Sequence, residues 1–195
     1  MLRKYLWVCV VLLNFCALRV SAAEGPALSE HFVGAVGFKA PAAWKRQSPA
    51  STMRRIQYEI PAVPGDREPA TFAVFYFGEG EGGRPAANVA RWRSQFSEPP
   101  LDFTPEIAGM EVDHLKVTTV HFQGTYREQM AAEAAEAKKN YAMLGAIIEG
   151  PEGPVFFKLT GPRATVLSAR PAFDAIVHSL RQAELKKGKA EKKVL

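Results

Sequence analysis

Cysteine is almost absent from this chain of 195 residues: Cys9 and Cys16 are the two cysteines, and both lie in an apolar N-terminal stretch. We expect that stretch to be removed on export, which would leave a mature chain without cysteine. Disulfide bonds, thiolate catalysis and thiolate-bound zinc are then excluded together.

Histidine is also scarce, and the four residues of this type are His31, His114, His121 and His178. His114 and His121 are seven residues apart on the strand predicted for residues 113–122, so their side chains should point to opposite faces of a sheet. We therefore expect no metal site shared among the histidines. No serine has the G-x-S-x-G sequence of a hydrolase. An enzyme, for instance a hydrolase that uses His114 or His121, stays open as an alternative, because catalytic groups can come together from distant parts of a chain.

The N-terminal residues have the form of a secretory signal peptide at residues 1–22. Two basic residues open it, and residues 5–18 are an apolar core too short to act as a stable membrane anchor. Cleavage is expected after Ala22, with cleavage after Ala23 as the alternative. A lipid on Cys16 is less favoured, because the phenylalanine before it is larger than lipoprotein processing prefers. We expect an exported protein, periplasmic or extracellular, without a transmembrane segment in the mature chain.

Positive charge is concentrated at the two ends of the chain. Eight lysines and arginines, but only one glutamate, lie in the expected signal peptide and in residues 186–195. The domain between them carries a small negative charge, so no nucleic-acid partner is expected. We expect residues 186–195 to form a disordered basic tail. A weak contact of this tail with an anionic surface is an alternative function, and it would use Lys186, Lys187, Lys189, Lys192 and Lys193.

A single domain is predicted for residues 31–185, after a short lead-in at residues 23–30. Strands are predicted at residues 32–38, 53–60, 71–77, 113–122, 141–149 and 155–160. The last two should form a hairpin through a loop of about five residues. Residues 141–149 are apolar on both alternating sides, so this strand should be covered on both faces, near the centre of a sheet.

Two helices are predicted between and after these strands. The first begins at Pro85, places Trp92 and Phe96 on one face, and ends before two prolines. The second runs from about residue 168 to 185, because Pro171 is tolerated in a first turn but not inside a longer helix. Residues 128–139 favour helix but lack an apolar stripe, which predicts a short exposed helix or a mobile excursion.

Strands in succession with two helices, without βαβ alternation, predict an α+β fold with a mainly antiparallel sheet and helices packed on its faces. The expected core residues are large and apolar. They are Phe75, Phe77, Trp92, Phe96, Leu144, Ile148, Phe157, Leu159, Phe173, Ile176 and Leu180.

Two short motifs favour structure over chemistry. Gly78, Gly80 and Gly83 match G-x-G-x-x-G, but Glu79 and Glu81 would face a pyrophosphate with negative charge, so we favour a plain turn. The same glutamates lack the aspartate spacing of a calcium loop.

The sequence Arg91-Trp92-Arg93 is the second motif, and it resembles the basic and aromatic pattern of nucleic-acid binding. Helical geometry instead predicts an inward tryptophan between two solvated arginines. No catalytic, cofactor-binding or metal-binding residue is therefore assigned from the sequence, and no cofactor is expected.

Several segments resemble the C-terminal half of proteins of the PsbP-like superfamily. They are residues 141–149 (YAMLGAIIE), residues 156–162 (FFKLTGP) and the helix that contains Phe173. The chain is more closely similar to small secreted bacterial proteins of that type with no assigned function. The resemblance implies a six-stranded antiparallel sheet between helices, an α/β/α sandwich. It implies a fold and not an activity, although members of the superfamily include non-enzymatic binding proteins. The leading hypothesis is an exported, non-enzymatic domain that binds a ligand or assists an assembly, with an unknown protein or envelope component as its partner.

Overall fold

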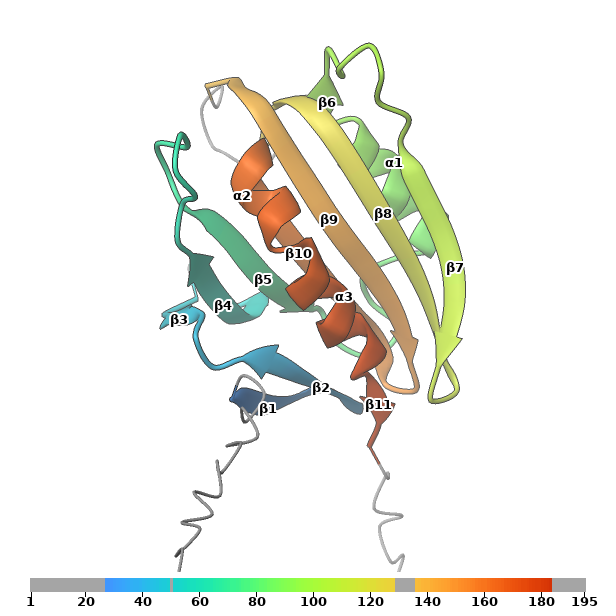
Figure 1. Ribbon diagram of the computed structural model, residues 1–195. Helices are drawn as coiled ribbons and strands as arrows, with labels where there is room; N and C mark the ends of the chain where they lie inside the picture. Colours follow the sequence, from blue (N-terminus) through green and yellow to red (C-terminus); the bar gives the residue numbers. More distant parts are fainter. Residues whose placement is uncertain (1–26, 50, 129–135, 184–195) are drawn as a thin grey trace, which may run out of the picture.

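The computed structural model describes residues 27–49, 51–128 and 136–183 (Figure 1). The expected signal peptide at residues 1–22, the first half of the lead-in (residues 23–26) and the basic tail at residues 186–195 lie outside these ranges. So do residues 129–135 of the alanine-rich segment.

The described chain contains two antiparallel sheets. The larger sheet has eight strands in the order β3-β4-β5-β10-β9-β8-β6, with β7 also paired to β8 (Figure 1). Its strands are β3 (Lys45–Gln47), β4 (Arg54–Ile60), β5 (Ala70–Tyr76), β6 (Phe96–Ser97), β7 (Glu106–Val112), β8 (Leu115–Tyr126), β9 (Lys138–Gly150) and β10 (Gly153–Pro162). The smaller sheet has the order β1-β2-β11, formed by β1 (Leu28–Val33), β2 (Val36–Pro41) and β11 (Arg181–Gln182).

The hairpin of β9 and β10 lies in the interior of the large sheet, as predicted. Every residue of β9 from Tyr141 to Ile148 is buried, which confirms that this strand is covered on both faces. The turn is shorter than the five residues expected. Gly150 pairs with Gly153 across only two residues, and Gly153 has a φ of +107°, a conformation that glycine adopts without strain.

The prediction of a six-stranded sheet is wrong in number. Strand β7 falls in a stretch that has no apolar alternation, because nearly all of its residues are exposed, so its sequence carries no strand signal. Residues 32–38, predicted as one strand, instead span a hairpin that turns at Gly34. Strand β1 begins at Leu28, inside the expected lead-in. The strands β3, β6 and β11 are two or three residues long and are stabilised by pairing with longer neighbours.

Helices cover both faces of the large sheet (Figure 1). Helix α1 (Pro85–Arg93) lies on one face, and α2 (Arg163–Ser168) and α3 (Arg170–His178) lie on the other. None of the helices in the described ranges is long and apolar enough to cross a membrane.

The predicted C-terminal helix at residues 168–185 is wrong at its C-terminal end. Pro171 stands in the first turn of α3, as expected, but the helix ends at His178. The chain then forms β11, where Arg181 and Gln182 pair with β2. Strand pairing satisfies the backbone there, although residues 180–185 would also suit a helix.

Two apolar cores lie on opposite faces of the large sheet. The larger core joins that sheet to α2, α3 and the small sheet, and the smaller one lies under α1. The predicted core residues Trp92, Leu144, Ile148, Phe157, Leu159, Phe173, Ile176 and Leu180 are buried. Phe75 and Phe96 are half-buried against the smaller core. Phe77 is 37% exposed, which corrects its assignment to the core.

The prediction of a helix or excursion at residues 128–139 is wrong at its C-terminal end. Lys138 and Lys139 are the first residues of β9, where Lys138 pairs with Tyr126 of β8.

Candidate ligand-binding pocket

Helix α1 leaves part of its face of the sheet uncovered, and a cavity of about 600 Å³ lies beside it. Cavities of roughly 300 to 1,000 Å³ are typical of small-molecule sites. Its wall is formed by side chains of α1 and of the five strands β4, β5, β8, β9 and β10, with some from the adjoining loops. It includes Arg54, Thr71, Ala73, Phe75, Phe77, Arg91, Trp92, Tyr126, Tyr141, Phe156, Lys158 and Thr160.

Cross-strand pairing between β5 and β10 explains the layout of this wall. Lys158 pairs with Ala73, Phe156 with Phe75, and Thr160 with Thr71. Because side chains alternate along a strand, these residues share one face while their neighbours enter the larger core. The wall therefore has an aromatic end, a lysine in the middle and a threonine end.

Lys158 is the central charged group of the pocket. Its Nζ atom donates to Oε1 of Gln95 at 2.8 Å and to the hydroxyl of Tyr126 at 3.1 Å. Burial lowers the pKa of Lys158 to about 8. The negative charge of Glu128 opposes this decrease, and the positive charges of Arg54 and Arg91 add to it. No carboxylate within the described ranges forms an ion pair with this ammonium.

Two other cations of the pocket have carboxylate partners. Lys138 lies 2.6 Å from Glu68, and Arg54 lies 3.5 Å from Glu128. The other charged residues of the rim are Arg91 and Glu136, which are exposed to solvent and opposite in sign. The ammonium of Lys158 is thus the inner charge that the pocket itself does not balance.

Hydroxyl groups lie around Lys158. The rings of Tyr126 and Tyr141 stack with centroids 5.8 Å apart and planes 2° from parallel. Burial raises the pKa of both phenols, that of Tyr141 to about 12, so both keep their protons near neutral pH. The Oγ1 atom of Thr160 is buried and has no hydrogen-bond partner among the described residues. A ligand could supply that partner.

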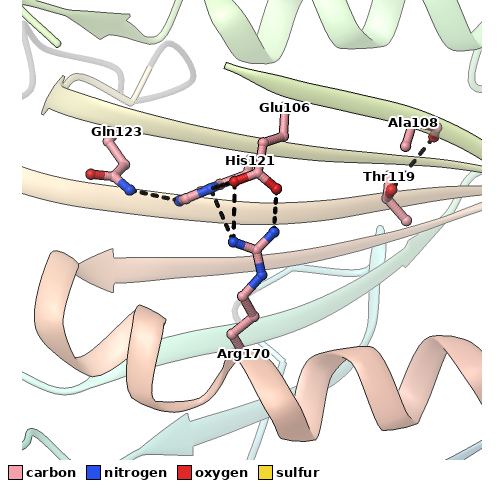
Figure 2. Close-up of polar contacts among 6 residues, drawn as sticks. All are labelled: Glu106, Ala108, Thr119, His121, Gln123 and Arg170. Atoms are coloured by element: carbon pink, nitrogen blue, oxygen red, sulfur yellow. Dashed lines mark hydrogen bonds and ion pairs between the residues drawn. The ribbon is translucent and has the colours of Figure 1, made fainter. Parts of the chain in front are cut away.

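A second polar cluster lies on the opposite face of the sheet, where Figure 2 shows Glu106 of β7, His121 and Gln123 of β8, and Arg170 of α3. Nδ1 of His121 lies 2.9 Å from Oε1 of Glu106, and Nε2 lies 2.9 Å from the side-chain nitrogen of Gln123. With this amide orientation Nε2 accepts and Nδ1 carries the proton. The guanidinium of Arg170 donates to both oxygens of Glu106.

The charges of this cluster are matched internally. Hydrogen bonds from Arg170 and then His121 lower the pKa of Glu106 to about 2. Burial lowers the pKa of His121, against the opposing effect of Glu106, and its side chain is only 4% exposed. The cluster joins β7, β8 and α3, and a bond from Thr119 to the Ala108 carbonyl at 3.4 Å adds to it (Figure 2).

His121 does not form the nucleophile and base pair that a hydrolase needs. Its accepting nitrogen is occupied by Gln123, and no hydroxyl group of the described residues is bonded to it. His114 is not on the strand as predicted, because it lies in the turn between β7 and β8 with a φ of +63°. This geometry gives no support to the hydrolase alternative.

The other two histidines lie in separate places. His31 of β1 lies 2.7 Å from the hydroxyl of Tyr58, and His178 is exposed on α3. Within the described ranges, no group of three histidine, aspartate or glutamate side chains is placed to hold a metal ion.

The glycine motif lies in the loop from β5 to α1, within an antiparallel sheet. The side-chain amide of Asn88 donates to the carbonyl oxygens of Gly82 at 2.7 Å and Arg84 at 3.0 Å, so α1 itself holds this loop. Trp92 is 5% exposed while Arg91 and Arg93 are exposed, which confirms the interpretation of that motif as a packed tryptophan between solvated arginines.

Sequence reasoning missed Lys158 as a candidate site residue. A signal was present, because a lysine interrupts the apolar run of β10 between Phe157 and Leu159. Alternation places it on the face of Phe156. What the sequence does not show is that α1 stops short of this position and leaves a cavity over it.

No protein-family model matches the chain, and a search of curated proteins found no match. Several solved structures are similar to it, including the following two. One is a protein of unknown function from Pseudomonas aeruginosa, with 17% sequence identity, a TM-score of 0.44, and coverage of 80% of this chain and 96% of that one. The other is the solution structure of the cyanobacterial PsbP of Synechocystis sp. PCC 6803, with 11% identity, a TM-score of 0.49, and coverage of 83% and 96%. The resemblance to PsbP-like proteins is a likeness of fold, and it assigns no activity, partner or site residue.

Proposed function

We propose that this chain is an exported, non-enzymatic binding domain whose ligand occupies the pocket beside α1. The observation that carries the proposal is Lys158, an ammonium group in the wall of a cavity of about 600 Å³ that no carboxylate of the described residues neutralises. Placing a charge in such a wall is unfavourable for folding unless something compensates for it. A bound ligand would provide that compensation.

The groups around Lys158 suit binding better than catalysis. Its partners are an amide oxygen and a phenol whose pKa is raised, and neither can act as a base near neutral pH. The imidazole of His121 lies on the other face of the sheet, so it cannot reach this pocket. The pocket thus offers hydrogen bonds, one positive charge and aromatic surface.

Binding of a neutral fluorescent dye tests this proposal. Nile red should bind the protein with blue-shifted emission, and Thr71→Trp should abolish binding because the indole would fill the cavity. Ile107→Trp is the matched control, since it adds the same side chain to β7 at an exposed position. Circular dichroism should show both variants folded. Equal dye binding by Thr71→Trp and the wild type, or none by the wild type, would contradict the proposal.

Export is the second part of the proposal, and it is supported by the signal-like residues 1–22. Mature protein recovered from the cell envelope or the medium should begin at Ala23 or Glu24 and carry no lipid. Intact-mass measurement decides this directly. A diacylglycerol adduct on Cys16, or an uncleaved chain inside the cell, would contradict it.

A further inference from the structure

We infer that the pocket binds a small monoanion with an aromatic or apolar body, and that its carboxylate or equivalent group is held by Lys158. The inference rests on the proposed function and names the class of ligand. It depends on three features of the pocket: one unbalanced charge, hydrogen-bond donors beside it, and an aromatic wall at one end.

The charge of the ligand follows from the pairing of the pocket's own ions. Lys138 and Arg54 form ion pairs with Glu68 and Glu128. Among the described residues, the hydrogen-bond partners of Lys158 and of the exposed Arg91 are neutral. A single negative charge on the ligand would balance the ammonium of Lys158. The described lining carries four cationic and three anionic side chains, so a dianion such as a phosphate monoester would bring one negative charge more than this excess.

Two hydrogen-bond donors for the anionic group of the ligand, Lys158 and Thr160, lie on the same face of β10. An ammonium group has three protons, and two of those on Lys158 are used by Gln95 and Tyr126. The third can point into the cavity. Thr160 follows two residues later on the same face of β10, roughly 7 Å along the strand, and its buried hydroxyl lacks a partner among the described residues. The ammonium of Lys158 can donate to one oxygen of a carboxylate, and the buried Thr160 hydroxyl can donate to the other once its side chain turns toward the cavity.

The body of the ligand would lie toward the opposite end of the wall. There Phe75 and Phe156 form a cross-strand pair, and the ring of Trp92 meets Phe156 edge to face at 6.3 Å. Phe77 packs against the same phenylalanine at 5.6 Å and is 37% exposed. Aromatic side chains of this kind favour an aromatic or apolar partner.

Calorimetric titration with three probes of one shape tests this class of ligand. Phenylpropionate, phenylpropionamide and phenylpropylamine share a phenyl ring and differ in charge. The wild type should bind the carboxylate about tenfold or more tightly than the amide, as a charge-assisted hydrogen bond implies, and the amine most weakly. Lys158→Met should reduce carboxylate binding to the level at which the same variant binds the amide. Lys158→Arg should keep the preference.

The matched control is Lys116→Met, which removes the same charge from an exposed position on β8 outside the pocket. It should keep the wild-type preference. Loss of the carboxylate preference in Lys116→Met would show a general effect of net charge and would overturn the inference. Equal binding of carboxylate and amide by the wild type would overturn it as well. A protein that binds Nile red and the amide but shows no preference for the carboxylate would leave the proposed function standing. Failure to bind Nile red would overturn the proposed function itself.

The preference should also depend on pH in a direction set by Lys158. The charged or titratable groups that face it are Arg54, Arg91, Tyr126 and Glu128. Carboxylate binding by the wild type should weaken as pH rises above about 8, where Lys158 of the free protein loses its proton. Binding by Lys158→Arg should stay constant over the same range, because the guanidinium keeps its charge. A parallel decline in both proteins would contradict the assignment of Lys158.

Discussion

The Nζ atom of Lys158 donates a hydrogen bond to the side-chain oxygen of Gln95 at 2.8 Å, and this bond joins the interior strand β10 to the residues just after α1. Gln95 is itself buried, and its backbone carbonyl accepts from the amide of Arg127 beyond β8. The lysine is therefore held in place before any ligand arrives. Such preorganisation reduces the ordering cost of binding.

The pH dependence of the free energy of unfolding should show that the charged form of Lys158 destabilises the folded protein. Its pKa is about 8 in the folded protein and 10.5 as its ordinary value. Because the folded pKa is the lower one, the unfolded chain binds more protons between these values, and stability rises with pH there. The free energy of unfolding of the wild type should rise relative to Lys158→Met between pH 8 and 10.5. Urea titrations at several pH values measure this, and a constant difference would contradict the buried charge.

Acid should destabilise the protein through Glu106 and His121. The pKa of Glu106 is lowered from 4.5 to about 2, so its contribution is present above pH 4.5 and is lost as pH falls toward 2. The lowered pKa of His121 acts in the same direction below its ordinary value of 6.5. Glu106→Gln should lower stability at pH 7 and flatten the loss between pH 4.5 and 2.

Glu111→Gln is the control for this acid response, because Glu111 is exposed on the same strand and lies 3.9 Å from the exposed His114. Chemical denaturation at pH 7, 5 and 3 should give it the wild-type dependence. An unchanged acid response in Glu106→Gln would show that the cluster of Glu106, His121 and Arg170 is not coupled to folding.

Gly145 allows α1 to sit close to the sheet. A methyl group added there would lie 2.6 Å from the ring of Trp92 and 2.9 Å from Val120. Gly145→Ala should therefore destabilise the protein by about 1 to 3 kcal/mol, as overpacking does, and should loosen the wall of the pocket. Gly109→Ala is the control, since its added methyl group would contact nothing within 4 Å. Thermal unfolding measures the stability of the two variants. Equal stability of Gly145→Ala and Gly109→Ala would contradict this packing.

Phe173 anchors α3 on the larger core. It is 2% exposed and meets the ring of Phe72 at 6.3 Å. Phe173→Ala should lower the free energy of unfolding by about 3 to 5 kcal/mol. Leu101→Ala removes a fully exposed side chain and should change it by less than about 0.5 kcal/mol. A loss below 1 kcal/mol for Phe173→Ala in denaturant titration would be inconsistent with its burial.

The parts of the fold predicted correctly from the sequence are those with strong periodicity. Strand β9 is apolar on both sides and is buried on both, and the spacing of Phe173, Ile176 and Leu180 marks the face of the C-terminal helical region that packs on the sheet. The end of that helix was not predictable in this way, because pairing with β2, a distant segment, draws residues 181 and 182 into a strand. Strand β7 has no buried face, so it leaves no pattern to detect.

The candidate site was hidden for a similar reason. The lysine of β10 and the tyrosines of β8 and β9 are visible in the sequence, but their convergence depends on the register of three strands. The cavity over them depends on where α1 ends. Neither the strand register nor the end of α1 has a signal in the local sequence. The packing of Trp92 does have one, because Trp92 shares a helical face with Val89.

Mapping of backbone amide shifts by NMR during a titration with phenylpropionate would locate the bound ligand on the protein. Saturable shifts are expected on the pocket wall, at Thr71, Tyr126, Lys158 and Thr160, and none at β7 or α3. Thr71→Trp should show no such shifts at the same concentrations. Saturable shifts centred on Glu106 and Arg170, or the same pocket shifts in Thr71→Trp, would contradict the claim that this pocket is the binding site.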